Sequence, residues 1–142
     1  MEQYFHIGVK AIFLNGRKEI LILKKNPGHG TGGGYWDIPG GRIEKGCGIE
    51  DTLKREIGEE LGITDFRIIR LFDNCVSNII PHSGEHGLFL ASYICTLDPK
   101  NPIGLDSEHT EYKWASISEV KELLKIKYPK SFLGKLDDLA IS

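Results

Sequence analysis

Residues 36–63 read WDIPGGRIEKGCGIEDTLKREIGEELGI, and they carry the clearest structural signals in the chain. Its second half combines strong helix formers with apolar residues at every fourth position, which predicts an amphipathic helix over residues 49–61. The apolar positions are Ile49, Leu53, Ile57 and Leu61. Gly62 follows at the place where a left-handed residue ends many helices. A Pro-Gly-Gly corner at residues 39–41 precedes the helix and leaves backbone groups free beside it.

Strand-like segments lie on both sides of this stretch. Residues 5–14 and 19–23 are apolar and are separated by Asn15-Gly16, which predicts a β-hairpin whose arms are covered on both faces. Further strands are expected over residues 66–71, 87–97 and 114–117, and helices from the Ser116-x-x-Glu119 capping box to about residue 126 and over residues 131–139. Strands with interleaved helices predict an α/β (α+β) fold.

The composition excludes several classes of protein. The 142 residues are 40% hydrophobic and 27% charged, which fits one folded domain over residues 1–142 and argues against a disordered chain. A net charge of -2, from 18 basic and 20 acidic residues, predicts neither general nucleic-acid binding nor membrane adhesion. No apolar run reaches the roughly 20 residues of a membrane span, and no secretory signal begins the sequence.

The cysteines point to a reducing compartment. Cys47, Cys75 and Cys95 are odd in number and widely spaced, so they fit neither a disulfide framework nor a zinc site. We therefore expect a cytoplasmic protein.

Three glutamates on the expected helix are the strongest candidates for chemistry. Glu56, Glu59 and Glu60 stand at i, i+3 and i+4, so their carboxylates fall within an arc of about 100°. Carboxylates this close repel one another unless a cation lies among them, and Mg²⁺ prefers such oxygen ligands. A solvated acidic face is the alternative interpretation of the same spacing.

The surroundings of these glutamates resemble the Nudix hydrolases. The signature of that family is G-x5-E-x7-R-E-U-x-E-E-x-G-U, where U is a bulky aliphatic residue. Gly41 opens the match, and residues 55–63 (REIGEELGI) fit every fixed position of its second half. The resemblance implies a mixed β-sheet sandwiched between helices, with a metal site built from a loop, a helix and a loop.

One position departs from the signature. Cys47 stands where the family has its first Glu, which in the family supports the loop and helix, often through the signature Arg, here Arg55. The departure bears on the positioning of Arg55 more than on metal binding. Glu44 or Glu50 is a candidate to replace the missing carboxylate.

The resemblance implies a metal-dependent pyrophosphohydrolase, which cleaves a nucleoside diphosphate linked to another group by water attack at phosphorus. Mg²⁺ or Mn²⁺ would be held by Glu56, Glu59, Glu60 and the Gly40 carbonyl, while Arg55 would orient a helix glutamate. The expected partner is a small-molecule nucleotide, with no nucleic-acid polymer and no membrane, and the chain is a monomer or homodimer. The alternative function is a catalytically weakened module of the same fold that binds a nucleotide or an ADP-ribose-like ligand.

Members of this family often add a carboxylate from outside the signature, as metal ligand or general base. The segment DSEHTEYKW at residues 106–114 offers Glu108 as the first candidate and Glu111 as the second. Either residue is equally compatible with a solvated loop charge.

Five further residues are candidates for substrate contacts. Tyr35 and Trp36 can stack on a base, although large aromatic rings more often pack in the core. Lys24 ends the second strand, where its ammonium group can meet a phosphate tail. His82 and His86 flank an expected loop and can bind phosphate or transfer protons, with solvent exposure as the alternative.

Overall fold

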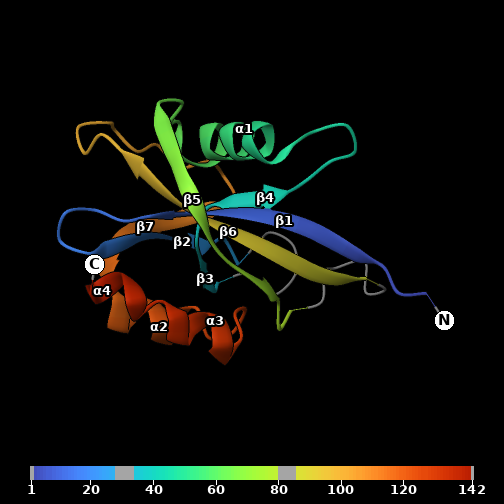
Figure 1. Cartoon of the computed structure of the whole chain (residues 1–142). Coiled ribbons are helices and arrows are strands. Elements are labelled where there is room, and N and C mark those ends of the chain that lie inside the picture. The colour runs from blue at the N-terminus through green and yellow to red at the C-terminus, as the bar shows by residue number, and fades with distance from the viewer. Residues whose placement is uncertain (1, 28–33, 80–85, 142) are drawn as a thin grey trace.

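The computed structural model describes residues 2–27, 34–79 and 86–141, and it shows two β-sheets that lie between helices (Figure 1). The elements in chain order are β1 (Phe5–Phe13), β2 (Glu19–Lys25), β3 (Trp36–Asp37), β4 (Gly40–Arg42), α1 (Ile49–Leu61), β5 (Phe66–Val76), β6 (Gly87–Leu97), β7 (His109–Ser116), α2 (Ile117–Leu123), α3 (Lys130–Lys135) and α4 (Asp138–Ile141).

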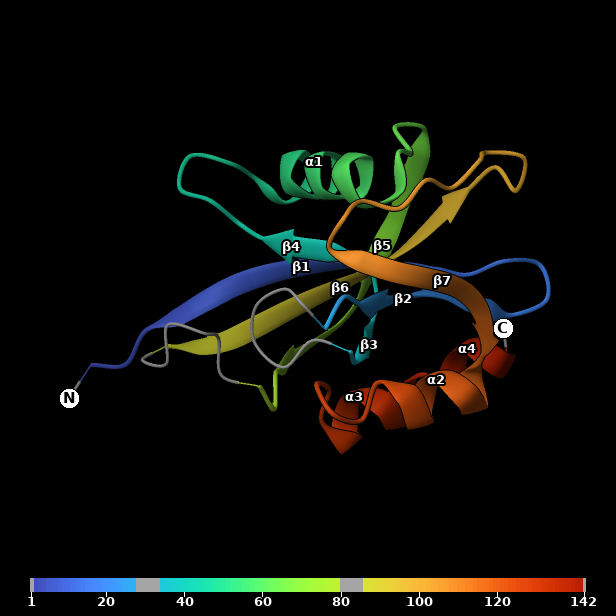
Figure 2. The same ribbon diagram turned by 180° about the vertical axis from the view of Figure 1, so that it is seen from behind.

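The larger sheet is mixed and has the order β4-β1-β6-β5, in which β1 and β6 are parallel and the other pairs are antiparallel. The smaller sheet has the order β3-β2-β7 and is antiparallel. Helix α1 covers one side of the sheets and α2, α3 and α4 cover the other (Figures 1 and 2). The expected arrangement of a mixed sheet sandwiched between helices is confirmed.

Two hydrophobic cores fill the space on either side of the sheets, and strand β2 contributes to both. Leu21 and Leu23 pack against the apolar face of α1, while Ile20 and Ile22 pack against the layer formed by α2 to α4. All four side chains are almost completely buried, and burial of each contributes about 1.5–3 kcal/mol to folding. Covering on both faces explains why the strand is continuously apolar instead of alternating.

The turn between the first two strands is as predicted, but their pairing is not. The side-chain Oδ1 of Asn15 accepts hydrogen bonds from the backbone of Arg17 at 3.0 Å and of Glu19 at 2.9 Å, which closes the turn. Beyond it, β1 and β2 share a single bridge, between Leu14 and Ile20, and then belong to different sheets. The expected hairpin is therefore wrong.

The physical reason is that residues 36–42 lie between the two diverging strands. Their first part, β3, pairs with β2, and their second part, β4, pairs with β1. Between these pairings the Pro39 carbonyl accepts a hydrogen bond from the Ala11 amide at 2.8 Å. One short segment thus satisfies the edges that the two strands would otherwise offer to each other.

Helix α1 begins and ends at the predicted residues. Gly62 adopts φ 70° and donates its amide to the Gly58 carbonyl, which forms the expected left-handed cap. Gly58 itself is not required by close packing, because a Cβ added there would meet only the Ile63 carbonyl at 4.0 Å.

The later elements differ from prediction mainly in length. Both β5 and β7 are edge strands and extend into polar stretches, since one edge of each faces solvent. The Ser116 hydroxyl caps α2 by accepting from the Glu119 amide at 3.2 Å, as the capping box predicts. The expected last helix is divided into α3 and α4.

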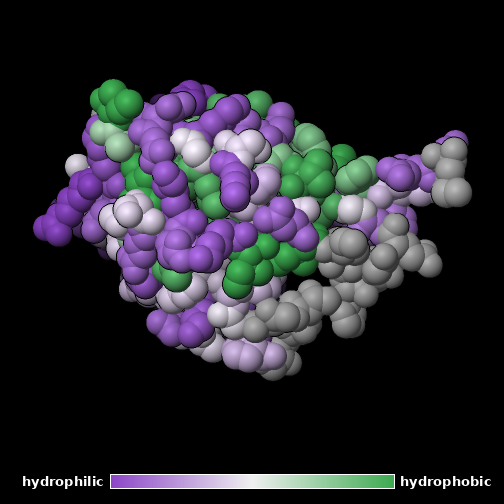
Figure 3. All heavy atoms as spheres, turned by 90° about the horizontal axis from the view of Figure 1, so that it is seen from below, coloured by the Kyte–Doolittle hydropathy of each residue, from purple (hydrophilic) through white to green (hydrophobic). Residues whose placement is uncertain are grey.

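Hydrophilic residues cover most of the face that carries α2 to α4, with a few hydrophobic patches between them (Figure 3). Within the parts of the chain that the structure describes, no helix has the length and hydrophobicity needed to cross a membrane.

Candidate active site

A cleft of about 660 Å³ lies between α1 and the segment that follows α2, across strands β1 and β4. Its size is that of small-molecule sites in proteins. Glu56 and Glu60 of α1 line one end together with the Pro-Gly-Gly corner, and Lys127, which follows α2, lines another part of the wall.

The two glycines of the corner allow its backbone to approach β1 and α1 closely. Gly40 has φ 142°, and a Cβ on it would overlap the Val9 carbonyl, so only glycine fits there. A Cβ on Gly41 would overlap the carboxyl group of Glu56. The Glu56 carboxylate therefore lies directly against the backbone of the corner.

Glu60 is the most buried of the three signature carboxylates. Its Oε1 accepts a hydrogen bond from the Gly40 amide at 2.8 Å. Burial raises the pKa of Glu60 to about 8, with a smaller contribution from the charge of Glu56, while Lys10 and the Gly40 amide act in the opposite direction. Because burial penalises its charged form, Glu60 would have to lose its proton to bind a cation, and the positive charge of that cation would offset the penalty of burial.

Arg55 contacts Glu56, its neighbour on the helix, which lines the cleft. Its Nη2 is 3.3 Å from Oε1 of Glu56, so it is placed to orient that carboxylate. Its Nη1 lies 4.0 Å from the sulfur of Cys47 and 4.0 Å from a carboxylate oxygen of Glu44. Of the two candidates to replace the missing Glu, Glu44 faces Arg55, whereas Glu50 pairs with a lysine, Lys54.

Glu59 is exposed, and it is not among the described residues that line the cleft. Nor do any three His, Cys, Asp or Glu side chains of the described residues form a group that could hold a metal alone. The donor set nevertheless fits Mg²⁺, which typically binds through one or two carboxylates and completes its shell with water and substrate phosphates. Glu56 and Glu60, carried by one helix turn, provide those two carboxylates at the cleft wall.

Strand register places the two carboxylate candidates outside the signature, Glu108 and Glu111, in different surroundings. Glu108, just before β7, lines the cleft. Glu111 instead lies opposite Lys24 in the β2–β7 ladder and forms an ion pair with it at 3.8 Å. Lys24 also pairs with Trp36, on the other side of β2. None of these three residues lines the cleft, whereas the next residue along β2, Lys25, does.

Only some of the aromatic and histidine candidates lie in or beside the cleft. Tyr35 lines the cleft, whereas Trp36 packs on the core of the α2–α4 side with the Lys113 ammonium 4.7 Å above its ring. The ring of His86 packs against that of His6 at a tilt of 47°, with 5.2 Å between the centroids, and it is His6 that lines the cleft. His82 lies outside the described residues.

Sequence reasoning missed a buried histidine beside Glu60. The Nδ1 of His109 lies 2.8 Å from Oδ1 of Asp106, and its Nε2 lies 3.9 Å from Oε2 of Glu60. Since an ionised carboxylate only accepts hydrogen bonds, the pairing with Asp106 places a proton on Nδ1. The interleaved acidic residues of the 106–114 segment were the only signal of this contact.

A buried charged cluster in the cleft was also missed. Asp37 accepts hydrogen bonds from the ammonium groups of Lys10 at 3.0 Å and Lys127 at 2.6 Å, and from the Tyr128 hydroxyl at 2.6 Å. Burial would raise the pKa of Asp37, but the two lysines outweigh it and hold that pKa far below its usual value. For Lys127 burial prevails and lowers the pKa to about 8, even beside Asp37.

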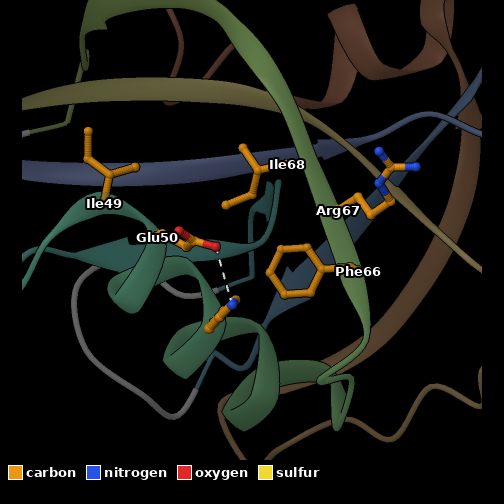
Figure 4. A pocket seen from close by; sticks show the side chains of 6 residues that line it. Ile49, Glu50, Phe66, Arg67 and Ile68 are labelled. Atoms are coloured by element: carbon orange, nitrogen blue, oxygen red, sulfur yellow. Dashed lines mark ion pairs between the residues drawn. The ribbon is translucent and has the colours of Figure 1, made fainter.

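A second hollow, of about 490 Å³, lies between α1 and β5 (Figure 4). It contains the ion pair of Glu50 with Lys54 at 3.2 Å, and apolar side chains such as Phe66 form its wall. None of Glu56, Glu59 and Glu60 is among the described residues that line it, whereas Glu56 and Glu60 line the larger cleft.

The family of the chain follows from this fold and this carboxylate helix. The family model of the NUDIX domain matches residues 4–133, and the chain therefore belongs to this family. Nudix hydrolase 6 of Arabidopsis thaliana is 33% identical over 122 residues, which cover 80% of this chain and 40% of that protein. The chain thus spans less than half the length of this curated relative.

Solved structures are similar over nearly the whole chain. The MutT protein of Methanosarcina mazei Go1 superposes with a TM-score of 0.79 at 23% identity, covering 99% of this chain and 96% of that one. The Ap4A hydrolase of C. elegans, solved as a binary complex, gives a TM-score of 0.74 at 20% identity, covering 96% and 98%. At these identities the similarity is one of fold.

Proposed function

We propose that this chain is a divalent-metal-dependent pyrophosphohydrolase, which cleaves a nucleoside diphosphate linked to another group by water attack at phosphorus. The observation that carries the proposal is the buried carboxyl of Glu60, bonded to the Gly40 amide at the wall of a nucleotide-sized cleft. Family membership, and a solved neighbour named as an Ap4A hydrolase, support a nucleotide as the substrate.

The proposed metal is Mg²⁺ or Mn²⁺. Glu56 and Glu60 are its proposed ligands at the cleft wall, with Glu59 and the Gly40 carbonyl completing the set. When bound, the metal would neutralise phosphate charge and activate the attacking water. Arg55 keeps the Glu56 carboxylate in place, and Glu108 is the proposed carboxylate from outside the signature because it lines the cleft.

We also propose that residues 1–142 act as a single domain in the cytoplasm, where the three free cysteines would remain reduced. The proposed partner is a small-molecule nucleotide rather than a nucleic-acid polymer or a membrane.

The test is product release from a panel of nucleotides with Mg²⁺ or Mn²⁺. The panel holds nucleoside triphosphates and their oxidised forms, dinucleoside polyphosphates, ADP-ribose and nucleotide sugars. A Glu60→Gln variant replaces the proposed metal ligand with a side chain that cannot ionise, and Glu50→Gln is the matched control on the exposed face of the same helix. Metal-dependent hydrolysis that is lost only in Glu60→Gln supports the proposal. Tight nucleotide binding without turnover in the wild type would favour a binding module instead.

A further inference from the structure

The buried cluster of Lys10, Asp37, Lys127 and Tyr128 lies in the cleft but takes no part in the chemistry proposed above. Its two lysines and Asp37 line the cleft, and each of the three side chains is less than one-tenth exposed. Buried charged groups are costly unless they are paired, so the hydrogen-bonding capacity that the pairing leaves over is informative.

Asp37 has no capacity left for a ligand. Its Oδ2 accepts from Lys10 and Lys127, and its Oδ1 accepts from the Tyr128 hydroxyl and from the Ile38 amide at 2.8 Å. Two bonds at each oxygen use the lone pairs that a carboxylate offers. A donor group of a ligand would find no acceptor on Asp37.

Lys127 can still donate hydrogen bonds to a ligand. Among the residues that the structure describes, its ammonium group donates one hydrogen bond, to Asp37, so two of its three N–H groups have no acceptor there. Lys10 donates to Asp37 and to the Ile38 carbonyl at 3.3 Å, which leaves one of its three. The cluster therefore presents donors to the cleft.

The surroundings of Lys127 suit a flat ring. The Tyr35 ring centroid lies 6.0 Å from its ammonium nitrogen. Ile79, Leu88 and Leu90 line the same cleft. The Lys127 carbonyl accepts a hydrogen bond from the amide of Asn78, which holds the adjacent Ile79 near the cluster. A phosphate would gain nothing from these apolar groups, whereas a heterocycle would bury surface against them.

We propose that the Lys127 ammonium group recognises an oxo group on the heterocyclic base of the substrate, so that the enzyme prefers oxo-bearing bases over amino-bearing ones. The inference rests on the proposed function, in which the phosphates lie at Glu56 and Glu60. With the phosphates there, the base extends along the cleft toward Lys127. An exocyclic amine at that point would face N–H donors, and both groups would lose their hydrogen bonds.

The test compares substrates that differ at one position of the base. ITP and ATP carry an oxygen or an amine at C6, and UTP and CTP carry them at C4. We expect kcat/KM to be about tenfold or more higher for the oxo member of each pair, as the loss of a buried hydrogen bond predicts. In Lys127→Met the ratio falls to near one. Lys127→Gln, whose amide both donates and accepts, gives an intermediate ratio. Lys125→Met is the matched control, because Lys125 is exposed and pairs with Glu122.

Binding separates this inference from the proposed function. Calorimetric titration of the metal-free protein with IMP against AMP, and with UMP against CMP, requires no turnover. Preference for IMP and UMP, lost in Lys127→Met, supports the inference even if no nucleotide is hydrolysed. Equal binding within both pairs overturns it even if hydrolysis is fast.

A further outcome would also overturn it. If Lys127→Met weakens every nucleotide by the same factor, and weakens inhibition by tripolyphosphate equally, Lys127 binds a phosphate oxygen instead of the base. Melting temperatures of all variants verify folding, and the wild-type ratios test the preference without any substitution.

Discussion

The buried carboxyl of Glu60 predicts an unusual pH dependence of stability in the metal-free protein. Its pKa rises from an ordinary value of 4.5 to about 8 in the folded chain, mainly because of burial. The folded state therefore binds a proton that the unfolded state has already released between these two values. The stabilisation that the Glu60 carboxyl contributes to folding is complete below about pH 4.5, decreases as pH rises and is lost above about pH 8.

The magnitude follows from the pKa. Each tenfold change in proton affinity corresponds to about 1.4 kcal/mol, so ionisation of Glu60 costs the folded state on the order of 4 kcal/mol across this window. Glu60→Gln keeps an oxygen that can accept from the Gly40 amide but does not ionise. Relative to wild type, the variant should become more stable by that amount as pH rises from 5 to 8.

Urea denaturation in EDTA at pH 5, 6, 7 and 8 measures the effect. Glu59→Gln is the control, because Glu59 is exposed and its replacement should leave the pH profile parallel to that of wild type. With Mg²⁺ present, the wild type should recover stability at pH 8 and Glu60→Gln should not. A constant difference between wild type and Glu60→Gln from pH 5 to 8 in EDTA would refute the reasoning, since it would mean that burial leaves this carboxyl ionised.

Three further substitutions test other parts of the site and its helix. Gly58→Ala should raise the free energy of unfolding by about 0.5–1 kcal/mol in urea titrations, because its Cβ would meet only the Ile63 carbonyl at 4.0 Å, without a clash, and the helix gains propensity; a lower free energy of unfolding would mean that the Cβ meets a closer neighbour in solution. Cys47→Glu should raise kcat, since it brings a carboxylate to Arg55; unchanged activity and stability would show that the position is tolerant. Gly41→Ala should weaken Mn²⁺ binding about tenfold or more, measured by electron paramagnetic resonance, because its Cβ displaces Glu56; unaltered affinity would show that Glu56 is not a ligand.

Local patterns predicted the helix and its carboxylates well. The four-residue apolar spacing and Gly62 fix both ends of α1, since these signals depend only on neighbouring residues. The pairing of β1 with β2 was predicted wrongly for the opposite reason. A turn brings two strands together, but competition from residues 36–42 decides their partners, and a Pro-Gly-Gly stretch gives little indication that it forms strands.

The buried charged cluster could not be predicted from the sequence. Asp37 is 27 residues from Lys10 and 90 residues from Lys127, so no spacing rule connects them. Lys127 stands two positions after the exposed Lys125, and large apolar or aromatic residues flank both lysines in the sequence. Only the packing of the α2–α3 connection against β3 distinguishes the buried lysine from the exposed one.

The segment from Trp36 to Arg42 pairs with both sheets, and it therefore links the site to the local unfolding of either sheet. Its Gly40 amide holds Glu60, and its Pro39 carbonyl holds β1, so loosening either sheet also releases the carboxylate. The amides of Gly40 and Ala11 should then exchange with deuterium only through global unfolding, as slowly as the central strands. In the proposed enzyme, substrates would accordingly meet a rigid Pro-Gly-Gly corner, and other walls of the cleft would adjust to their different shapes.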